Sequence, residues 1–333
     1  MSTSSVISLP QGVRDILPDE AEKIGAVESG ILAVFAKRGF QRVITPLLEY
    51  VDTLSIGMGE GLKERVLKFI DPSTGRVIAI RPDITAQIAR LAATRMRESP
   101  LPLKLCYNEN VLRLSEPRDG KSREVLQLGA EFISAKPSPE ADAAMVSMAV
   151  ESLLGIGLKS FKVDIGDVGF LKSVLDRLPL TEQERRAVKG AIAIKDTSGL
   201  EAILAGLAAP VNEGDRALFV NLTTLYGEEE VIEKAASYTT NPAAHERLDN
   251  LRALVDIITQ NGHGAYITLD LGEMRGFDYY TGVIFEGFAA GVGKAILSGG
   301  RYDNLLARYG YPAAATGFAF DVENIVAALG VRQ

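Results

Sequence analysis

Strand-forming segments occupy two separate blocks of the sequence, and this division constrains the fold most. From about residue 170 to 262 strand signals vanish, and the pattern is charged, rich in Ala and Leu, and helical. Strands return after it, at 266–271, 283–288, 295–298 and 315–320. The order predicts one α+β core, a mostly antiparallel sheet flanked by helices, that is interrupted and then resumed. We therefore expect core, helical insertion and core at 1–169, 170–262 and 263–333.

The first block begins with a helix pattern over about 19–38, where apolar residues recur at helical spacing and Gly39 follows as a C-cap. Segments 67–70 and 77–80 flank the turn sequence DPSTG, which predicts a hairpin. A short helix is expected next, at 84–96. Two long strands follow, at 103–114 and 124–133, and a polar loop at 115–123 joins them.

Composition excludes several classes of function. The chain has 333 residues, a net charge of −7 and a pI of about 5.2, which argues against a dedicated RNA-binding face. A single cysteine, Cys106, permits neither a disulfide nor a cysteine zinc site within one chain. Neither His245 nor His263 lies in a metal or nucleophile pattern, so no metal and no cofactor are expected. We also expect a cytoplasmic protein, because neither a signal peptide nor an apolar run of the ~18 residues that a membrane span needs is found.

Five segments, in order along nearly the whole chain, resemble the motifs of class II aminoacyl-tRNA synthetases, and specifically histidyl-tRNA synthetase. They are LPQGVRDILP (9–18) with ITPLLE (44–49), RPDITAQIAR (81–90), VLRLSEPRDGKSREVLQLGAE (111–131), MRGFDYYTGVIFE (274–286), and GGRYDNLL (299–306) with ATGFAFDVENIV (315–326). The first is similar to the dimer-interface motif of that family, and the third to its strand-loop-strand motif. Any one of them is weak evidence, but five in order strongly favour the synthetase fold.

The resemblance implies a pocket for free L-histidine. A carboxylate for the ammonium group, arginines for the anion and aromatic side chains for the ring suit that ligand. The implied roles are Asp83, Thr85 and Gln127 at the α-amino end, Glu131 as acceptor of an imidazole N–H, Tyr279 and Tyr280 as ring walls, and Arg113 and Arg275 toward a carboxylate or phosphate.

Plainer structural roles exist for several of these residues. Asp83 follows Pro82 and precedes a helix, so it could be an N-cap. Glu131 could form an ion pair with Arg123. Tyr279 and Tyr280 could lie on opposite faces of one strand, which would direct only one of them into the pocket.

The sequence departs from the synthetase pattern where ATP would bind. The fifth segment is similar to the third motif of that family, and segment 111–131 to its second motif. The third motif ends in an arginine in the synthetases, and Asn324 stands at its place here. Ser115 stands where the second motif has a glutamate, and the loop also departs at Leu114, Asp119 and Ser122. Adenylate formation depends on cations around the triphosphate. Loss of the third-motif arginine should therefore lower its rate by several orders of magnitude.

Two further departures concern the histidine pocket and the length of the chain. Asp83 replaces a longer glutamate, which keeps the charge but moves it by about one methylene. The sequence ends about ten residues after Asn324, so no anticodon-binding domain is expected.

A synthetase fold with these departures resembles the regulatory subunits of short-form ATP phosphoribosyltransferase, the first enzyme of histidine biosynthesis. The resemblance implies a non-catalytic subunit, with no catalytic residues, that activates a short catalytic chain and conveys feedback inhibition by histidine. It also implies a homodimer within a hetero-oligomer and no tRNA partner. The alternatives are an active truncated histidyl-tRNA synthetase-like ligase and a module that senses uncharged tRNA.

Overall fold

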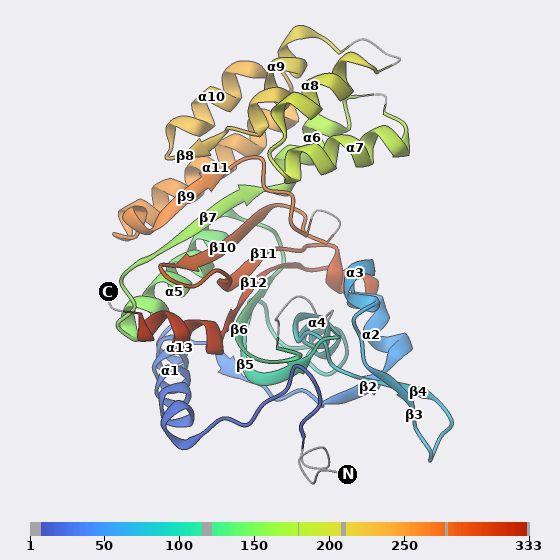
Figure 1. Cartoon of the computed structure of the whole chain (residues 1–333), viewed down its shortest axis with the longest axis vertical. Coiled ribbons are helices and arrows are strands. Elements are labelled where there is room, and N and C mark those ends of the chain that lie inside the picture. The colour runs from blue at the N-terminus through green and yellow to red at the C-terminus, as the bar shows by residue number, and fades with distance from the viewer. Residues whose placement is uncertain (1–7, 115–121, 179, 208–210, 277–278, 332–333) are drawn as a thin grey trace.

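Two β-sheets form the framework of the protein (Figure 1). The computed structural model describes residues 8–114, 122–178, 180–207, 211–276 and 279–331. The larger sheet has nine strands, in the spatial order β1 (Gln41–Arg42), β5 (Leu103–Leu112), β6 (Glu124–Ser134), β12 (Ala314–Asp321), β11 (Ala295–Arg301), β10 (Val283–Ala289), β7 (Phe161–Asp167), β9 (Ile267–Asp270) and β8 (Tyr226–Gly227). Only the pairs β1–β5 and β7–β9 are parallel. The expected α+β class with a mostly antiparallel sheet is confirmed.

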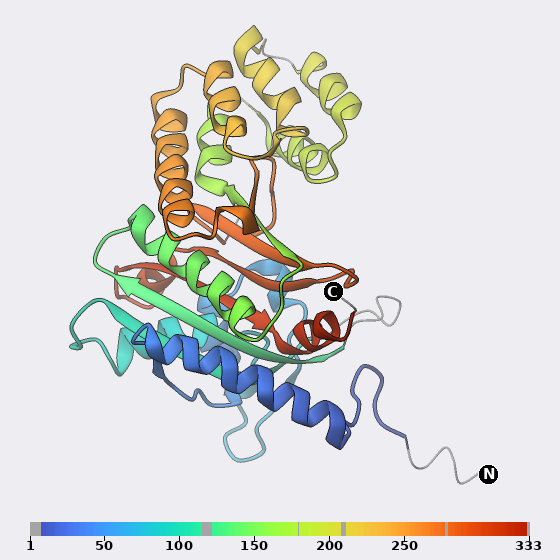
Figure 2. The same cartoon turned by 90° about the vertical axis from the view of Figure 1, so that its left-hand side faces the viewer.

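Helices cover one face of this sheet. In Figure 2, the blue, green and orange helices cross the side toward the viewer; they are α1 (Pro18–Lys37), α5 (Pro139–Gly155) and α11 (Pro242–Gln260). Helix α1 buries Ile24, Val27, Ile31 and Phe35, one apolar stripe at helical spacing. Gly39, just after its end, has φ +81°, a left-handed conformation that glycine adopts without strain.

The opposite face of the sheet carries a second and smaller hydrophobic core. It is built on β5 by α4 (Thr85–Thr94) and α12 (Leu305–Arg308), and α2 (Val51–Gly57) packs on α4. Side chains alternate between the faces of a strand, so in β6 Leu128 and Ala130 join the main core, while Ile133 joins this second core. Gln127 and Glu131 have the parity of Ile133, and therefore face the side where α4 lies.

The smaller sheet is separate from the large one. Its strands are β2 (Leu48–Tyr50), β4 (Val77–Ile80) and β3 (Lys68–Ile70), in that order, and the short helix α3 (Glu60–Lys63) precedes β3. The expected hairpin is β3–β4. The Asp71 carboxylate accepts hydrogen bonds from Ser73 and from the Thr74 hydroxyl in its turn, and Gly75 has φ +70°.

Most of the described residues between 168 and 260 are helical. Between β7 and α11 the chain forms α6 (Val168–Leu175), α7 (Glu182–Ala193), α8 (Thr197–Ala205), α9 (Glu213–Leu222) and α10 (Glu230–Tyr238). Their starts are specified locally: Thr181 and Glu184 form a capping box for α7, and Asp196 and Asn212 cap α8 and α9. The two-residue β8 was not expected; it pairs Tyr226 with Asp270 at the edge of the large sheet.

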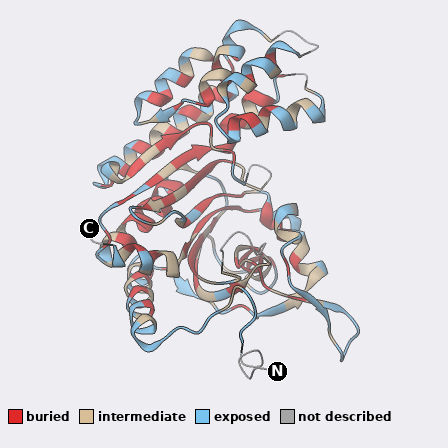
Figure 3. Cartoon of the chain, in the orientation of Figure 1, coloured by how far each residue is buried: buried red, intermediate tan, exposed pale blue. Residues whose placement is uncertain are grey.

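The last helix, α13 (Val322–Gly330), follows β12 directly, and the Asp321 side chain caps its start by accepting the Asn324 backbone N–H. The buried residues run through the large sheet and the inward sides of its helices (Figure 3). Among the described residues, none of the helices combines the length and the apolar character that crossing a membrane requires.

Candidate functional site

A cavity of about 250 Å³ lies beside the second core, and residues of β6 and β12 form part of its lining. Six of the eight expected site residues line it, namely Asp83, Thr85, Arg113, Gln127, Tyr279 and Tyr280. The other two, Glu131 and Arg275, do not line this cavity.

Asp83 and Arg113 form the charged end of the cavity. The Asp83 Oδ1 atom lies 3.5 Å from Arg113 Nη2, and Arg113 Nε donates to the Pro82 carbonyl at 2.7 Å. Asp83 Oδ2 also accepts from the Thr85 backbone N–H at 3.2 Å, at the start of α4. Asp83 thus has both of its expected roles: its carboxylate accepts a backbone N–H at the start of α4, and it also lines the cavity. A carboxylate beside a guanidinium can hold both charged ends of an amino acid.

Gln127 is buried and forms part of the lining of the same cavity. Its side chain is only 8% exposed, and its Oε1 atom has no hydrogen-bond partner among the described residues. Leaving a buried acceptor unpaired costs about 1–3 kcal/mol. A ligand N–H donor would remove that cost, which fits the expected position of Gln127 at an amino group.

Glu131 lies behind the cavity wall and is 1% exposed. It accepts hydrogen bonds from Thr85 Oγ1 at 2.8 Å, from the Tyr107 hydroxyl at 3.3 Å and from the Tyr302 hydroxyl. Burial raises the pKa of Glu131 to about 8, although the hydroxyl donors oppose that shift. Of these three hydroxyl groups, those of Thr85 and Tyr302 belong to cavity-lining residues and stand between Glu131 and an imidazole in the cavity. No ion pair between Glu131 and Arg123 forms among the described residues.

Both tyrosines of the fourth segment face the cavity. Neither belongs to a strand, because the backbone turns at Gly276, where φ is +60° and whose carbonyl accepts the N–H groups of Tyr279 and Tyr280. The two rings meet edge to face, with centroids 5.0 Å apart. The strand alternative, which would have directed only one of them inward, was wrong for this reason.

Arg275 lies outside this cavity, so it does not join the other expected histidine-site residues; of its two expected positions, toward a carboxylate or toward a phosphate, it lies on a larger neighbouring cavity. It forms ion pairs with Glu273, at 2.7 Å, and with Glu286. Two carboxylates therefore neutralise this guanidinium, and its planar group lies over the Phe288 ring.

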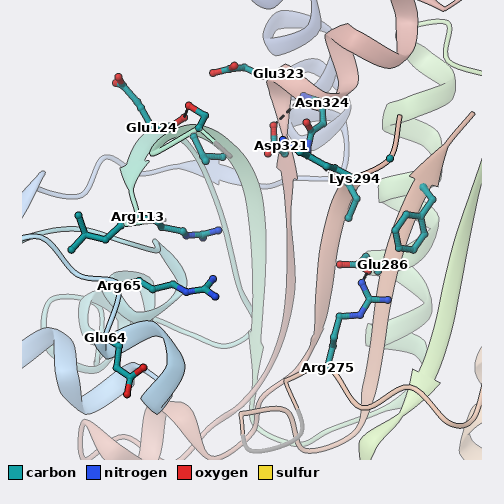
Figure 4. Close-up of a pocket in the computed structure, with 16 residues that line it drawn as sticks. Glu64, Arg65, Arg113, Glu124, Arg275, Glu286, Lys294, Asp321, Glu323 and Asn324 are labelled. Atoms are coloured by element: carbon teal, nitrogen blue, oxygen red, sulfur yellow. Dashed lines mark hydrogen bonds and ion pairs between the residues drawn. The ribbon is translucent and has the colours of Figure 1, made fainter. Parts of the chain in front are cut away.

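A larger cavity of about 1060 Å³ opens beside the first, and Arg113 lines both. It corresponds to the place where the synthetase resemblance puts ATP (Figure 4). Its charged lining comprises four cations and five carboxylates, namely Arg65, Arg113, Arg275 and Lys294 with Glu64, Glu124, Glu286, Asp321 and Glu323. Among the described residues, this lining holds one more carboxylate than cations, whereas a triphosphate needs an excess of positive charge.

Asn324 sits in this cavity where the synthetase motif has its arginine. Its side-chain amide donates to the Ala295 carbonyl at 2.8 Å, and its backbone N–H donates to Asp321 at 3.0 Å. Asn324 is thus hydrogen-bonded to neighbouring strands of its own chain. Ser115 and Asp119, two of the other departures, lie outside the described residues.

The sequence did not single out several residues that build the first cavity. Tyr302 lines it and contacts Glu131, while Ser298, Gly299 and Gly317 form part of its floor. Tyr302 and Gly299 belong to the GGRYD segment. This motif is recognised in the sequence, but its individual side chains were assigned no role there. In the described part of the chain, no cluster of three or more His, Cys, Asp or Glu side chains could hold a metal ion.

Comparisons with known proteins agree with this geometry. The chain matches the family model described as Histidyl-tRNA synthetase over residues 12–325. It is 46% identical to the ATP phosphoribosyltransferase regulatory subunit of Geobacter sulfurreducens, over 97% of this chain and 73% of that protein. The identity to the Moorella thermoacetica protein of the same name is 39%, over 99% and 84%. A solved structure from Bacillus halodurans, described as an ATP phosphoribosyltransferase regulatory subunit/histidyl-tRNA synthetase, superposes with a TM-score of 0.90 at 30% identity, over 99% of this chain and 85% of that one.

The antiparallel sheet, the motif-bearing strands β5 and β6 and the paired cavities define a class II aminoacyl-tRNA synthetase-like protein of the histidyl type. The altered ATP side and the curated relatives narrow this further. The chain belongs to the family of ATP phosphoribosyltransferase regulatory subunits, paralogues of histidyl-tRNA synthetase.

Proposed function

We propose that this chain activates a short-form ATP phosphoribosyltransferase catalytic subunit and makes it sensitive to L-histidine, at the first step of histidine biosynthesis. The observation that carries the proposal is the contrast between two neighbouring cavities. The smaller has an amino-acid-type set of charges, amide and rings, while the described lining of the larger holds more carboxylates than cations. The curated relatives are regulatory subunits by name.

Regulation of a separate active site requires two states of the complex with different histidine affinity. The coupling free energy is typically ~1–3 kcal/mol and is reciprocal for binding. Substrate on the catalytic chain must therefore change histidine affinity here by the same factor that histidine changes substrate affinity there.

Mixing this chain with a short ATP phosphoribosyltransferase should raise the activity of that enzyme and make it inhibited by histidine. Asp83→Ala should preserve activation but weaken inhibition about ten- to a hundred-fold, the equivalent of ~1–3 kcal/mol for a lost charged contact. Activity with and without histidine is the measurement. Asp249→Ala, at an exposed carboxylate on α11, is the matched control. If activity is untouched by this chain, the function is wrong; if both variants behave alike, the histidine site lies elsewhere.

We also propose that the chain has no catalysis of its own and binds no tRNA. It should show no histidine-dependent pyrophosphate–ATP exchange and should charge no tRNA. Asn324→Arg alone should not restore exchange, because Glu273 and Glu286 still neutralise Arg275. An authentic histidyl-tRNA synthetase is the positive control. Exchange above a blank without histidine would favour the truncated-ligase alternative instead.

A homodimer is the proposed assembly before the partner binds. The smaller sheet and the segment before it leave a group of large apolar side chains exposed, namely Ile44, Leu47, Leu48, Phe69, Ile70 and Val77. Exposed apolar groups of this size favour a protein interface. Ile44, Leu47 and Leu48 lie in the segment that resembles the family's dimer-interface motif, so a second copy of this chain is the proposed occupant, and two-fold dimers are the commonest closed assembly.

A further inference from the structure

The helical insertion contacts the segment of the chain that joins β9 to β10. This segment is residues 271–282, and we refer to its described residues as the connector. Gly276, Tyr279 and Tyr280 of the connector line the smaller cavity. The helices α6 to α10 of the insertion gather beyond the β7–β9 side of the large sheet (Figure 1). The place of the two tyrosines therefore depends on what holds the connector.

Helices of the insertion hold the connector near both of its ends. Near its start, Gly272 lies so close to α9 that a methyl group on it would overlap the Leu222 carbonyl oxygen. Near its end, Lys172 on α6 donates a hydrogen bond to the Tyr280 carbonyl at 2.8 Å. The connector is thus positioned by the insertion as well as by the two strands that it joins.

Lys195 adds an ion pair to these contacts. It lies between α7 and α8, and its Nζ atom is 2.6 Å from Oδ1 of Asp270, the last residue of β9. The same oxygen accepts the Gly272 backbone N–H at 2.9 Å. One carboxylate oxygen therefore joins a side chain of the insertion to the backbone of the connector.

The backbone of Lys195 has a conformation that glycine adopts at lower cost. Its φ is +57°, and among the described residues no other non-glycine residue has a positive φ. Helix α7 ends in a Schellman motif, in which the Lys195 N–H donates to the Ile192 carbonyl and the Asp196 N–H to the Ala191 carbonyl. Glycine is usual at this position because any side chain strains the backbone there. The ion pair with Asp270 is what the lysine side chain gains in return.

We propose that Lys195 is a positioning residue of the amino-acid site: its ammonium group, through Asp270, holds the connector where Tyr279 and Tyr280 wall the smaller cavity. This rests on the proposed histidine site. Lys195 does not line that cavity and acts only through the connector. Because coupling is reciprocal for binding, histidine in the cavity favours the docked insertion, and a partner chain that moves the insertion changes histidine affinity.

Lys195→Gly separates the ion pair from the backbone. It removes the ammonium group and also relieves the strained φ, which offsets the loss of a partly exposed ion pair, so urea unfolding should stay near that of wild type. Histidine affinity, measured by calorimetry, should nevertheless fall about three- to thirty-fold. Lys195→Arg keeps the cation and should recover most of that loss. Lys234→Ala, which removes an exposed cation from α10, is the charge control and should bind histidine as wild type does.

A double-mutant cycle tests whether Lys195 acts through Asp270. Asp270→Asn keeps an oxygen for the Gly272 N–H but removes the charge that Lys195 contacts. If the two residues act as one unit, the double variant with Lys195→Gly should bind histidine no more weakly than the weaker single variant. Losses of affinity that simply add would overturn the assignment.

The outcomes separate this assignment from the proposed function. If wild type binds no histidine, the histidine site and this assignment fail together. If wild type binds histidine and Lys195→Gly binds it equally well, only the role of Lys195 fails.

Hydrogen exchange of the wild-type protein decides the question if the variants do not fold. Histidine should slow amide exchange in residues 194–198, around Lys195, as well as in the connector, because the ligand stabilises the docked state. Exchange in 194–198 that histidine leaves unchanged would contradict the proposal.

Discussion

Glu131→Gln should remove a large part of the pH dependence of folding stability between about pH 5 and 8, and most of it above about pH 6, where the pKa of buried Asp167 lies. Glu131 is 1% exposed, and burial raises its pKa from 4.5 to about 8. The groups that face it are Thr85, Tyr107, Tyr302 and the carboxylate of Asp83; no cation is among them. The carboxyl group is therefore far easier to ionise in the unfolded chain than in the folded one.

The sign of the effect follows from proton linkage. Below about pH 4.5 both states hold the proton, and Glu131 costs nothing. As the pH rises, the unfolded state loses its proton first, so the free energy of unfolding decreases until the folded state also ionises near pH 8. The interval from 4.5 to about 8 corresponds to roughly 5 kcal/mol, at ~1.4 kcal/mol per pH unit.

Urea unfolding of the ligand-free protein at several pH values measures this. Wild type should lose about 3–4 kcal/mol from Glu131 between pH 5 and 8, and Glu131→Gln should lose much less. Glu201→Gln, at an exposed site on α8, is the matched control and should follow wild type. Parallel curves for wild type and Glu131→Gln would contradict a proton held by Glu131 in the folded state.

Local sequence patterns predicted much of the fold because local chemistry sets the corresponding elements. The apolar stripe of α1 ends at a glycine that adopts a positive φ, and the DPSTG turn folds on the side chain of Asp71. The two-residue strand β8 gave no such signal. It exists because Tyr226 meets Asp270 across the sheet edge, a contact between residues far apart in sequence.

The same distinction applies to the site. Gln127 and Asp83 reach the cavity through features that the sequence displays, strand parity and a helix start. The turn at Gly276 decides the directions of both tyrosines, and a turn of this kind has no periodic signal. The sequence did not decide between a carboxylate and a phosphate for Arg275; it lies on the larger cavity and pairs with Glu286, which comes near it only when β10 is in position.

Gly317→Ala should destabilise the protein by about 3 kcal/mol and abolish histidine binding. Gly317 is paired with Glu131 across β12 and β6. A methyl group on Gly317 would overlap Glu131 Oε2 and lie 2.8 Å from the Ala130 carbonyl oxygen. The carboxyl group would have to move, which breaks its bonds to Tyr302 and its neighbours in a site that has no water-exposed alternative.

Gly190→Ala is the matched control, because it makes the same chemical change without a steric conflict. Gly190 is exposed on α7, and no atom lies within 4 Å of the added methyl group. Alanine is the better helix former by about 1 kcal/mol, so this variant should be more stable than wild type and bind histidine normally. Urea unfolding and calorimetry measure both variants. If Gly317→Ala matched wild type in stability and histidine affinity, the Glu131 carboxyl could not be fixed under the cavity floor, and its part in ligand recognition would have to be given up.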